Sequence, residues 1–176
     1  MKRKIRLLFM IMILTIGMLV GCGKGEVKDV ENTKESSEFE EVDGMMVCID
    51  TESSPFEDSG LKISIKKGED GFAEFLITDK DGNETVNYYK FDFNENVVEK
   101  YNYVSAMGTA FYYYYDLEGK ELFKIEDGDH KDSTDSVKEA GRWDSSAEKI
   151  KEEVESLENY FKEQYGKTIE EAVLGE

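Results

Sequence analysis

Apolar and polar residues alternate along much of the chain between residues 45 and 125, which is the period of a half-buried β-strand. The alternation is clearest at Leu61, Ile63 and Ile65, which are separated by lysine and serine. Similar short segments with strand-forming residues recur at 45–50, 72–78, 86–93, 97–104, 110–116 and 122–125. The pattern therefore predicts about seven short strands.

Short polar segments separate several of these strands. Asp81-Gly82-Asn83, Asn94-Glu95-Asn96 and Glu118-Gly119-Lys120 are typical of hairpin turns. Strands joined by such turns pair with their neighbours in the chain. We therefore expect an antiparallel β-meander.

The apolar residues change their spacing near the C-terminus, where they recur every three or four positions and form one stripe on a helix. These residues are Ala147, Ile150, Val154, Leu157, Phe161 and Tyr165. Ser145 with Glu148 fits a capping box, and Gly166 is placed to end the helix, which gives a predicted helix at about 145–166.

A second capping box, Thr168 with Glu171, predicts a short final helix through Leu174. A helix with one apolar face has to cover another element, and the meander is the available one. The fold class is therefore α+β. We expect a curved antiparallel sheet or a partial barrel, with the C-terminal amphipathic helix packed on one face or end, over residues 42–176.

The first 21 residues differ from the rest of the chain. Lys2, Arg3, Lys4 and Arg6 form a basic start, and residues 7–20 are apolar apart from Thr15 and Gly17. About 14 apolar residues are too few for a typical transmembrane helix, which needs about 20. This arrangement predicts an export signal.

The apolar segment closes with Leu19-Val20-Gly21-Cys22. This sequence resembles the lipobox of bacterial lipoproteins. The resemblance implies cleavage between Gly21 and Cys22, attachment of lipid with fatty acids such as palmitate to the Cys22 thiol, and anchoring on the extracytoplasmic face of the cell membrane. The alternative is an uncleaved signal anchor with a chance cysteine.

Residues 22–41 are rich in charged residues, serine and threonine, with few apolar side chains. Such a segment buries too little to offset its loss of conformational entropy on ordering. We expect a disordered tether between the lipid and the domain.

The chain is strongly acidic, with a formal net charge of -18. A surface of this charge repels nucleic acid and anionic lipid head groups, so we expect no nucleic-acid partner. It is compatible with cationic partners and also with a simple solvated surface. Cys48, the cysteine that remains if Cys22 is lipidated, lies in the apolar segment 45–49 and is predicted to be a buried hydrophobic residue.

Two polar clusters are candidate metal sites. Residues 79–84 resemble the opening of a calcium-binding EF-hand loop, but Glu84 stands where glycine is needed and Lys90 where glutamate is needed, so a hairpin tip is the better prediction. Residues 127–132 gather acids around His130, the single histidine of the chain. One histidine gives poor support for a transition-metal site, and a solvated connection between sheet and helix is favoured.

No catalytic pattern stands out in the sequence. A serine or cysteine nucleophile would depend on His130, and no Gly-x-Ser-x-Gly motif surrounds a serine. Paired carboxylates for hydrolysis cannot be selected among 40 acidic residues. We therefore expect a protein that is not an enzyme and uses no metal or cofactor.

Four consecutive tyrosines, Tyr112, Tyr113, Tyr114 and Tyr115, follow Phe111 in a predicted strand. Alternation places Tyr112 and Tyr114 on one face, with Phe111, Tyr113 and Tyr115 on the other. The strand is either buried on both faces, or one set of rings faces solvent and joins Tyr88, Tyr101 or Tyr103 in a platform for sugars or a peptide. The second interpretation makes the four tyrosines candidate ligand-binding residues.

The sequence therefore predicts a lipid-anchored, non-catalytic binding or scaffolding module of the cell envelope. Its partner would be an envelope protein, a wall glycan or a small ligand. Two alternatives stay open: an envelope hydrolase that uses carboxylates, and an acidic immunity or inhibitor protein that neutralises a basic target.

Overall fold

The computed structural model describes residues 38–175. The predicted signal peptide, the predicted lipidation and cleavage site at Gly21 and Cys22, and most of the predicted tether lie outside these residues. Within 38–175, no helix combines the length and the apolar character that a membrane crossing requires.

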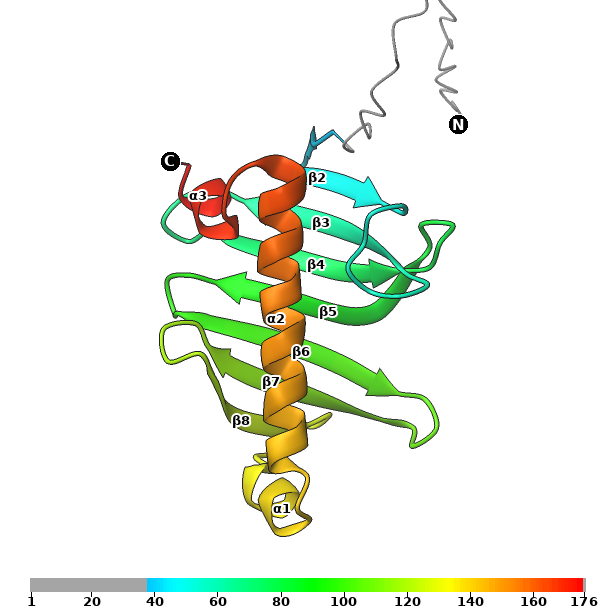
Figure 1. Ribbon diagram of the computed structural model, residues 1–176, viewed down its shortest axis with the longest axis vertical. Coiled ribbons are helices and arrows are strands. Elements are labelled where there is room, and N and C mark those ends of the chain that lie inside the picture. The colour runs from blue at the N-terminus through cyan, green and yellow to red at the C-terminus, as the bar shows by residue number, and fades with distance from the viewer. Residues whose placement is uncertain (1–37, 176) are drawn as a thin grey trace, which may run out of the picture. The chain divides into compact units, whose positions relative to one another are not determined.

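The described residues form an open sheet of eight antiparallel strands in which every strand pairs with its neighbours in the chain (Figure 1). The strands are β1 (Glu40–Val42), β2 (Met45–Asp50), β3 (Gly60–Lys66), β4 (Phe72–Thr78), β5 (Glu84–Asp92), β6 (Val97–Val104), β7 (Thr109–Asp116) and β8 (Glu121–Asp127). The predicted α+β meander is confirmed, in the form of an open sheet with one strand more than the predicted seven.

The extra strand is β1, which begins two residues before the predicted domain boundary at residue 42. It pairs with the start of β2, from Glu40 opposite Val47 to Val42 opposite Met45. Phe39, just before it, packs its ring against Tyr165 with centroids 5.0 Å apart. The folded region therefore includes the last residues of the segment predicted as a tether.

The three predicted hairpin turns are confirmed by the ends of the strands that flank them. At the β4–β5 tip, Asp79 Oδ1 accepts hydrogen bonds from the backbone N–H groups of Asp81 and Asn83. Gly82 there has φ of 81°, and Asn96 at the next tip has φ of 58°, a left-handed conformation that these two residue types tolerate well.

Three helices follow the sheet: α1 (Thr134–Glu139), α2 (Trp143–Tyr165) and α3 (Ile169–Leu174). In Figure 1, α2 crosses the strands of the sheet on one face, with α1 near the β8 edge and α3 near β3 and β4. A helix of 23 residues is about 34 Å long, and eight strands also span about 34 Å. One helix is therefore long enough to cross the sheet.

The ends of the helices match two of the three sequence predictions. Gly166 caps α2 with φ of 71°, and Thr168 with Glu171 forms the predicted capping box of α3. The capping box predicted for Ser145 with Glu148 was wrong, because α2 already begins at Trp143. Ser145 lies within the first turn, and its hydroxyl donates to the backbone carbonyl of Arg142.

The hydrophobic core lies between the sheet and the helices. Alternate residues of the strands face α2, as the period of two predicts. The sheet contributes Leu61, Ile63, Ile65, Ala73, Phe75, Tyr89, Phe91, Val98, Tyr115, Leu122 and Ile125, and the helices contribute Val137, Ile150, Val154, Leu157, Tyr160, Phe161, Ile169, Ala172 and Val173. The predicted apolar stripe of α2 is therefore the surface that covers the sheet.

Two buried polar contacts also join the sheet to α2. Lys100 of β6 forms an ion pair with Glu153, at 2.5 Å between Nζ and Oε2. The hydroxyl of Tyr160 donates a hydrogen bond to Oδ2 of Asp50 at the end of β2, at 2.6 Å. Burial lowers the pKa of Lys100, and the carboxylate of Glu153 opposes this effect.

Candidate binding surface on the open face of the sheet

The helices all contribute to the core on one side of the sheet, so the opposite side has no helix of the described residues over it. We call this side the open face. Its residues alternate along each strand with those of the core, and strand pairing aligns them in rows across the sheet. One row contains Tyr88, Tyr101 and Tyr112, which we call the tyrosine row.

The rings of the tyrosine row contact one another: Tyr88 and Tyr101 are stacked, and Tyr112 is tilted by 58° against Tyr101. Tyr88 and Tyr101 have centroids 5.5 Å apart and nearly parallel planes, and Tyr101 and Tyr112 have centroids 5.0 Å apart. His130, from the loop after β8, stacks on Tyr112 at 4.2 Å. The short distances between the three tyrosines arise because directly opposed residues on antiparallel strands have neighbouring side chains. The faces that Tyr88 and Tyr101 turn toward each other are therefore covered.

Carboxylates fix two hydroxyl groups on this face. Tyr88 donates to Glu99 Oε1 at 2.7 Å, and Tyr114 donates to Glu126 Oε2 at 2.8 Å. Burial raises the pKa of both tyrosines, and the acceptor carboxylates raise it further. Both phenols therefore stay protonated at neutral pH and hold the carboxylates in place.

Glu126 contacts three side chains on the open face, from β7, from β8 and from the loop after β8. Only 8% of the residue is exposed, and it pairs with Lys124 at 2.5 Å, with the hydroxyl of Tyr114, and with Nδ1 of His130 at 3.3 Å. The bond from Lys124 and that from Tyr114 lower the pKa of Glu126. The charge of Lys124 is therefore largely neutralised within the protein.

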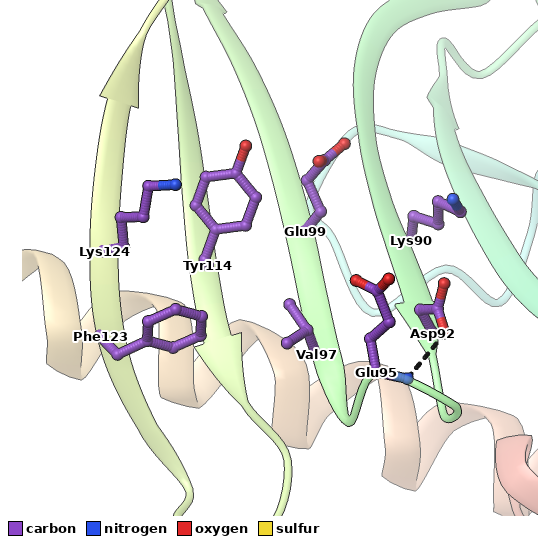
Figure 2. A pocket seen from close by; sticks show the side chains of 8 residues that line it. All are labelled: Lys90, Asp92, Glu95, Val97, Glu99, Tyr114, Phe123 and Lys124. Atoms are coloured by element: carbon purple, nitrogen blue, oxygen red, sulfur yellow. Dashed lines mark hydrogen bonds between the residues drawn. The ribbon is translucent and has the colours of Figure 1, made fainter. Parts of the chain in front are cut away.

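A pocket of about 270 Å³ lies beside the tyrosine row on the same face (Figure 2). Tyr114 and Phe123 form an aromatic wall, with centroids 6.3 Å apart. Val97 and Glu99 of β6 lie next to this wall, and Asp92 and Glu95 lie beyond them. The residues around it come from β5 to β8 and the β5–β6 turn: Lys90, Asp92, Glu95, Val97, Glu99, Tyr114, Phe123 and Lys124.

An irregularity in β8 places Phe123 in this pocket. The pairing of β7 with β8 shifts register between Tyr114 and Tyr115, so strict alternation fails. Leu122 and Ile125 face the core, whereas Phe123 and Lys124 between them both lie at the pocket on the open face. Phe123 keeps 46% of its surface exposed. The bulge therefore adds an aromatic side chain beside Tyr114.

The four predicted ligand-binding tyrosines are divided between the two faces, with the parity that alternation predicts. Tyr115 is 2% exposed in the core, and burial raises its pKa to about 12. Tyr113 packs on the same side, near Lys100. Tyr114 lines the pocket, and Tyr112 lies in the tyrosine row beside it. The candidate surface thus includes Tyr112 and Tyr114 but neither Tyr113 nor Tyr115.

Sequence reasoning did not identify most of the pocket. Its charged members lie singly at alternate positions of different strands, where they look like ordinary solvent-exposed residues. The one local signal was the spacing of Leu122 and Ile125, three positions apart within a strand, which indicates a bulge. That signal would have placed Phe123 on the face opposite the core.

The other predicted clusters have simpler roles. Residues 79–83 form a hairpin tip, where hydrogen bonds from Asn83 lower the pKa of Asp79. Residues 128–133 connect β8 to α1, and Asp127 Oδ1 accepts the backbone N–H groups of Asp129 and Lys131. Cys48 is 2% exposed, as predicted, and its sulfur lies 3.4 Å from the hydroxyl of Tyr165. In residues 38–175, no three acidic, histidine or cysteine side chains are grouped as metal ligands.

Comparison of the chain with protein-family models, curated proteins and solved structures found no match.

Proposed function

We propose that this protein is a lipid-anchored, non-catalytic binding module that acts outside the cytoplasmic membrane and holds its ligand on the open face of the sheet. The observation that supports this most is the one-sided cover of the sheet. The helices pack on one face and leave an aromatic pocket on the other.

The exposed rings support binding because they are large apolar groups left in contact with water. Phe123 on β8 and Tyr103 on β6 are 46% and 43% exposed. Aromatic side chains are frequent in binding surfaces because one end is apolar and, for tyrosine, the other forms hydrogen bonds. A ligand over the pocket would remove Phe123 from water without displacing any helix.

The binding proposal predicts that Phe123→Ala lowers the affinity for the ligand by about tenfold or more, because the side chain forms half of the aromatic wall. The measurement is a thermal-shift screen of the chain from residue 23 onward against oligosaccharides, peptides and small metabolites. A ligand at 100 times its dissociation constant stabilises the fold by about 2.7 kcal/mol.

Met107→Ala is the matched control, since Met107 is an exposed apolar residue at the β6–β7 turn, away from the pocket. A ligand whose affinity falls equally in both variants, or in neither, would count against the open face as the binding surface.

The anchoring proposal rests on the lipobox. Replacing Cys22 with serine removes the thiol that would accept lipid, so we expect loss of labelling by a fatty-acid probe and accumulation of the uncleaved precursor. Cys48→Ser is the control, because Cys48 is buried and should not be lipidated. Labelling that persists in the Cys22→Ser variant would exclude a lipid on this cysteine.

A carboxylate hydrolase is the second candidate, because Asp92, Glu95 and Glu99 line one pocket. Two of these groups already serve as acceptors: Asp92 for backbone N–H groups of its turn, and Glu99 for the hydroxyl of Tyr88. Turnover of a wall polysaccharide that is lost in Glu95→Gln or Glu99→Gln would favour hydrolysis over binding alone.

A further inference from the structure

The pocket on the open face contains more negative than positive charge. Asp92, Glu95 and Glu99 bring three carboxylates to it, and Figure 2 shows Glu99 on the strand next to Tyr114, with Asp92 and Glu95 farther from the aromatic wall. Of its two lysines, Lys124 is paired with the buried Glu126 outside the pocket lining. The pocket therefore keeps an excess of carboxylate charge.

Cations already lie over aromatic rings on this face. Lys124 Nζ is 4.7 Å from the centre of the Tyr114 ring, and Lys90 Nζ is 5.0 Å from that of Phe72. A ring attracts a cation to its face through its quadrupole. Phe123 is the pocket ring for which the structure records no cation, and it is exposed to solvent.

We propose that the pocket receives an arginine side chain from a basic polypeptide segment; this inference rests on the proposed binding function of the same face. A guanidinium group is planar, stacks on an aromatic ring and donates paired hydrogen bonds to carboxylates. It would lie against Phe123 and direct its N–H groups to Glu95 and Glu99. The apolar stem of the side chain would contact Val97.

The charge of the whole protein favours this partner. A net charge of -18 attracts cationic segments at long range and speeds their encounter with the surface. The pair Tyr88 and Tyr101 in the tyrosine row is less suited to a sugar, because the two stacked rings cover each other's faces. Charge and ring orientation therefore both favour a basic peptide over a neutral glycan.

The test uses two fluorescent peptides of the same sequence, one with arginines spaced by glycine and serine, and the other with citrulline in place of every arginine. Citrulline has nearly the same shape as arginine but no charge. Fluorescence anisotropy with the chain from residue 23 onward should show the arginine peptide binding at least about tenfold more tightly, with a difference that shrinks as salt rises.

Variants of the pocket separate local recognition from general attraction. Glu95→Gln with Glu99→Gln should weaken the arginine peptide by about tenfold or more, and so should Phe123→Ala. Glutamine at position 99 still accepts the hydroxyl of Tyr88, so the fold is retained, and thermal melting checks this. The control is Glu152→Gln with Glu163→Gln, which removes the same charge from the exposed side of α2 and should leave affinity within about twofold.

Three results would overturn the inference. Equal binding of the citrulline peptide would exclude cation recognition, and equal loss in the α2 control would exclude the pocket. A neutral oligosaccharide that binds in place of the peptide and is lost in Phe123→Ala would also overturn it, while leaving the proposed binding function intact. A ligand whose affinity is unchanged in the Phe123→Ala variant would instead contradict the proposed function itself.

Discussion

Asp50 shows how a single buried charge is accommodated at the scale of a residue. It is 4% exposed at the end of β2. Its Oδ1 accepts the backbone N–H groups of Glu52 and Ser53, each at 2.9 Å, and its Oδ2 accepts the hydroxyl of Tyr160. A buried carboxylate is tolerated only when its oxygens are hydrogen-bonded, so Tyr160 on α2 completes the set.

Tyr160→Phe should therefore destabilise the fold by about 2 kcal/mol, because it leaves one oxygen of a buried charge without its donor. Tyr165→Phe is the matched control. Its hydroxyl contacts the sulfur of Cys48 at 3.4 Å and also hydrogen-bonds with the hydroxyl of Tyr160, and neither of these partners is a carboxylate, so its loss should cost less than about 1 kcal/mol. Urea unfolding of both variants measures the difference, and equal costs would contradict the role assigned to Asp50.

At the scale of the element, the two Ser/Thr-x-x-Glu patterns show where a local motif predicts structure and where it does not. Thr168 caps α3, since Gly166 has already ended α2 and the chain is extended at Thr168. Ser145 does not lie at a helix start of this kind. The turn after α1 brings the chain into helical conformation at Trp143, so Ser145 lies within the helix.

Thr168→Ala should destabilise the fold by about 1 kcal/mol, because it removes the bond to the backbone N–H of Glu171 and exposes an unsatisfied helix terminus. Ser145→Ala should change stability by less than about 0.5 kcal/mol, since alanine suits a helix interior. Thermal or urea unfolding can compare the two. A larger loss in Ser145→Ala would mean that this hydroxyl stabilises α2 after all.

Elements with a strong apolar period were predictable, and elements that depend on their neighbours were not. The strands from β2 to β8 and the long α2 carry their own periodicity. β1 is two glutamates and a valine, and α1 has Val137 as its one buried apolar residue. Both are stabilised by packing, β1 by β2 and α1 by β8, which no local pattern reveals.

The candidate site was still less predictable, because it belongs to the scale of the whole molecule. Alternation correctly separated Tyr112 and Tyr114 from Tyr113 and Tyr115, but it could not say which pair the helix would cover. The pocket also depends on strand register, which brings residues 90, 99, 114 and 124 into one row. Register is fixed by the complete set of turns and by the core.

The tyrosines also determine how the whole molecule responds to alkaline pH. Eight of them have a pKa raised mainly by burial: Tyr88, Tyr89, Tyr112, Tyr113, Tyr114, Tyr115, Tyr160 and Tyr165. In the unfolded chain they ionise near pH 10. The stability that they contribute is therefore complete below pH 10 and is lost as pH rises further. The lowered pKa of Lys100 acts in the opposite direction, but it is one group against eight.

We therefore expect the fold to lose stability steeply above about pH 10. Phenolate absorbance in the near ultraviolet should rise together with the loss of far-ultraviolet circular dichroism, because most tyrosines ionise only as the chain unfolds. Separate transitions, with most phenols ionised while the circular dichroism is still native, would contradict the burial of these side chains.

The order of elements also decides when a nascent chain becomes a stable domain. Each strand of the meander pairs with the segment synthesised just before it, so the sheet can assemble as the chain emerges. The helices that cover its apolar face come last, from residue 134 onward. A chain stalled before Trp143 would display a paired sheet with a bare hydrophobic surface, which is the kind of intermediate that aggregates or is held by chaperones. Packing of the helices on the sheet is therefore the step that covers its apolar face.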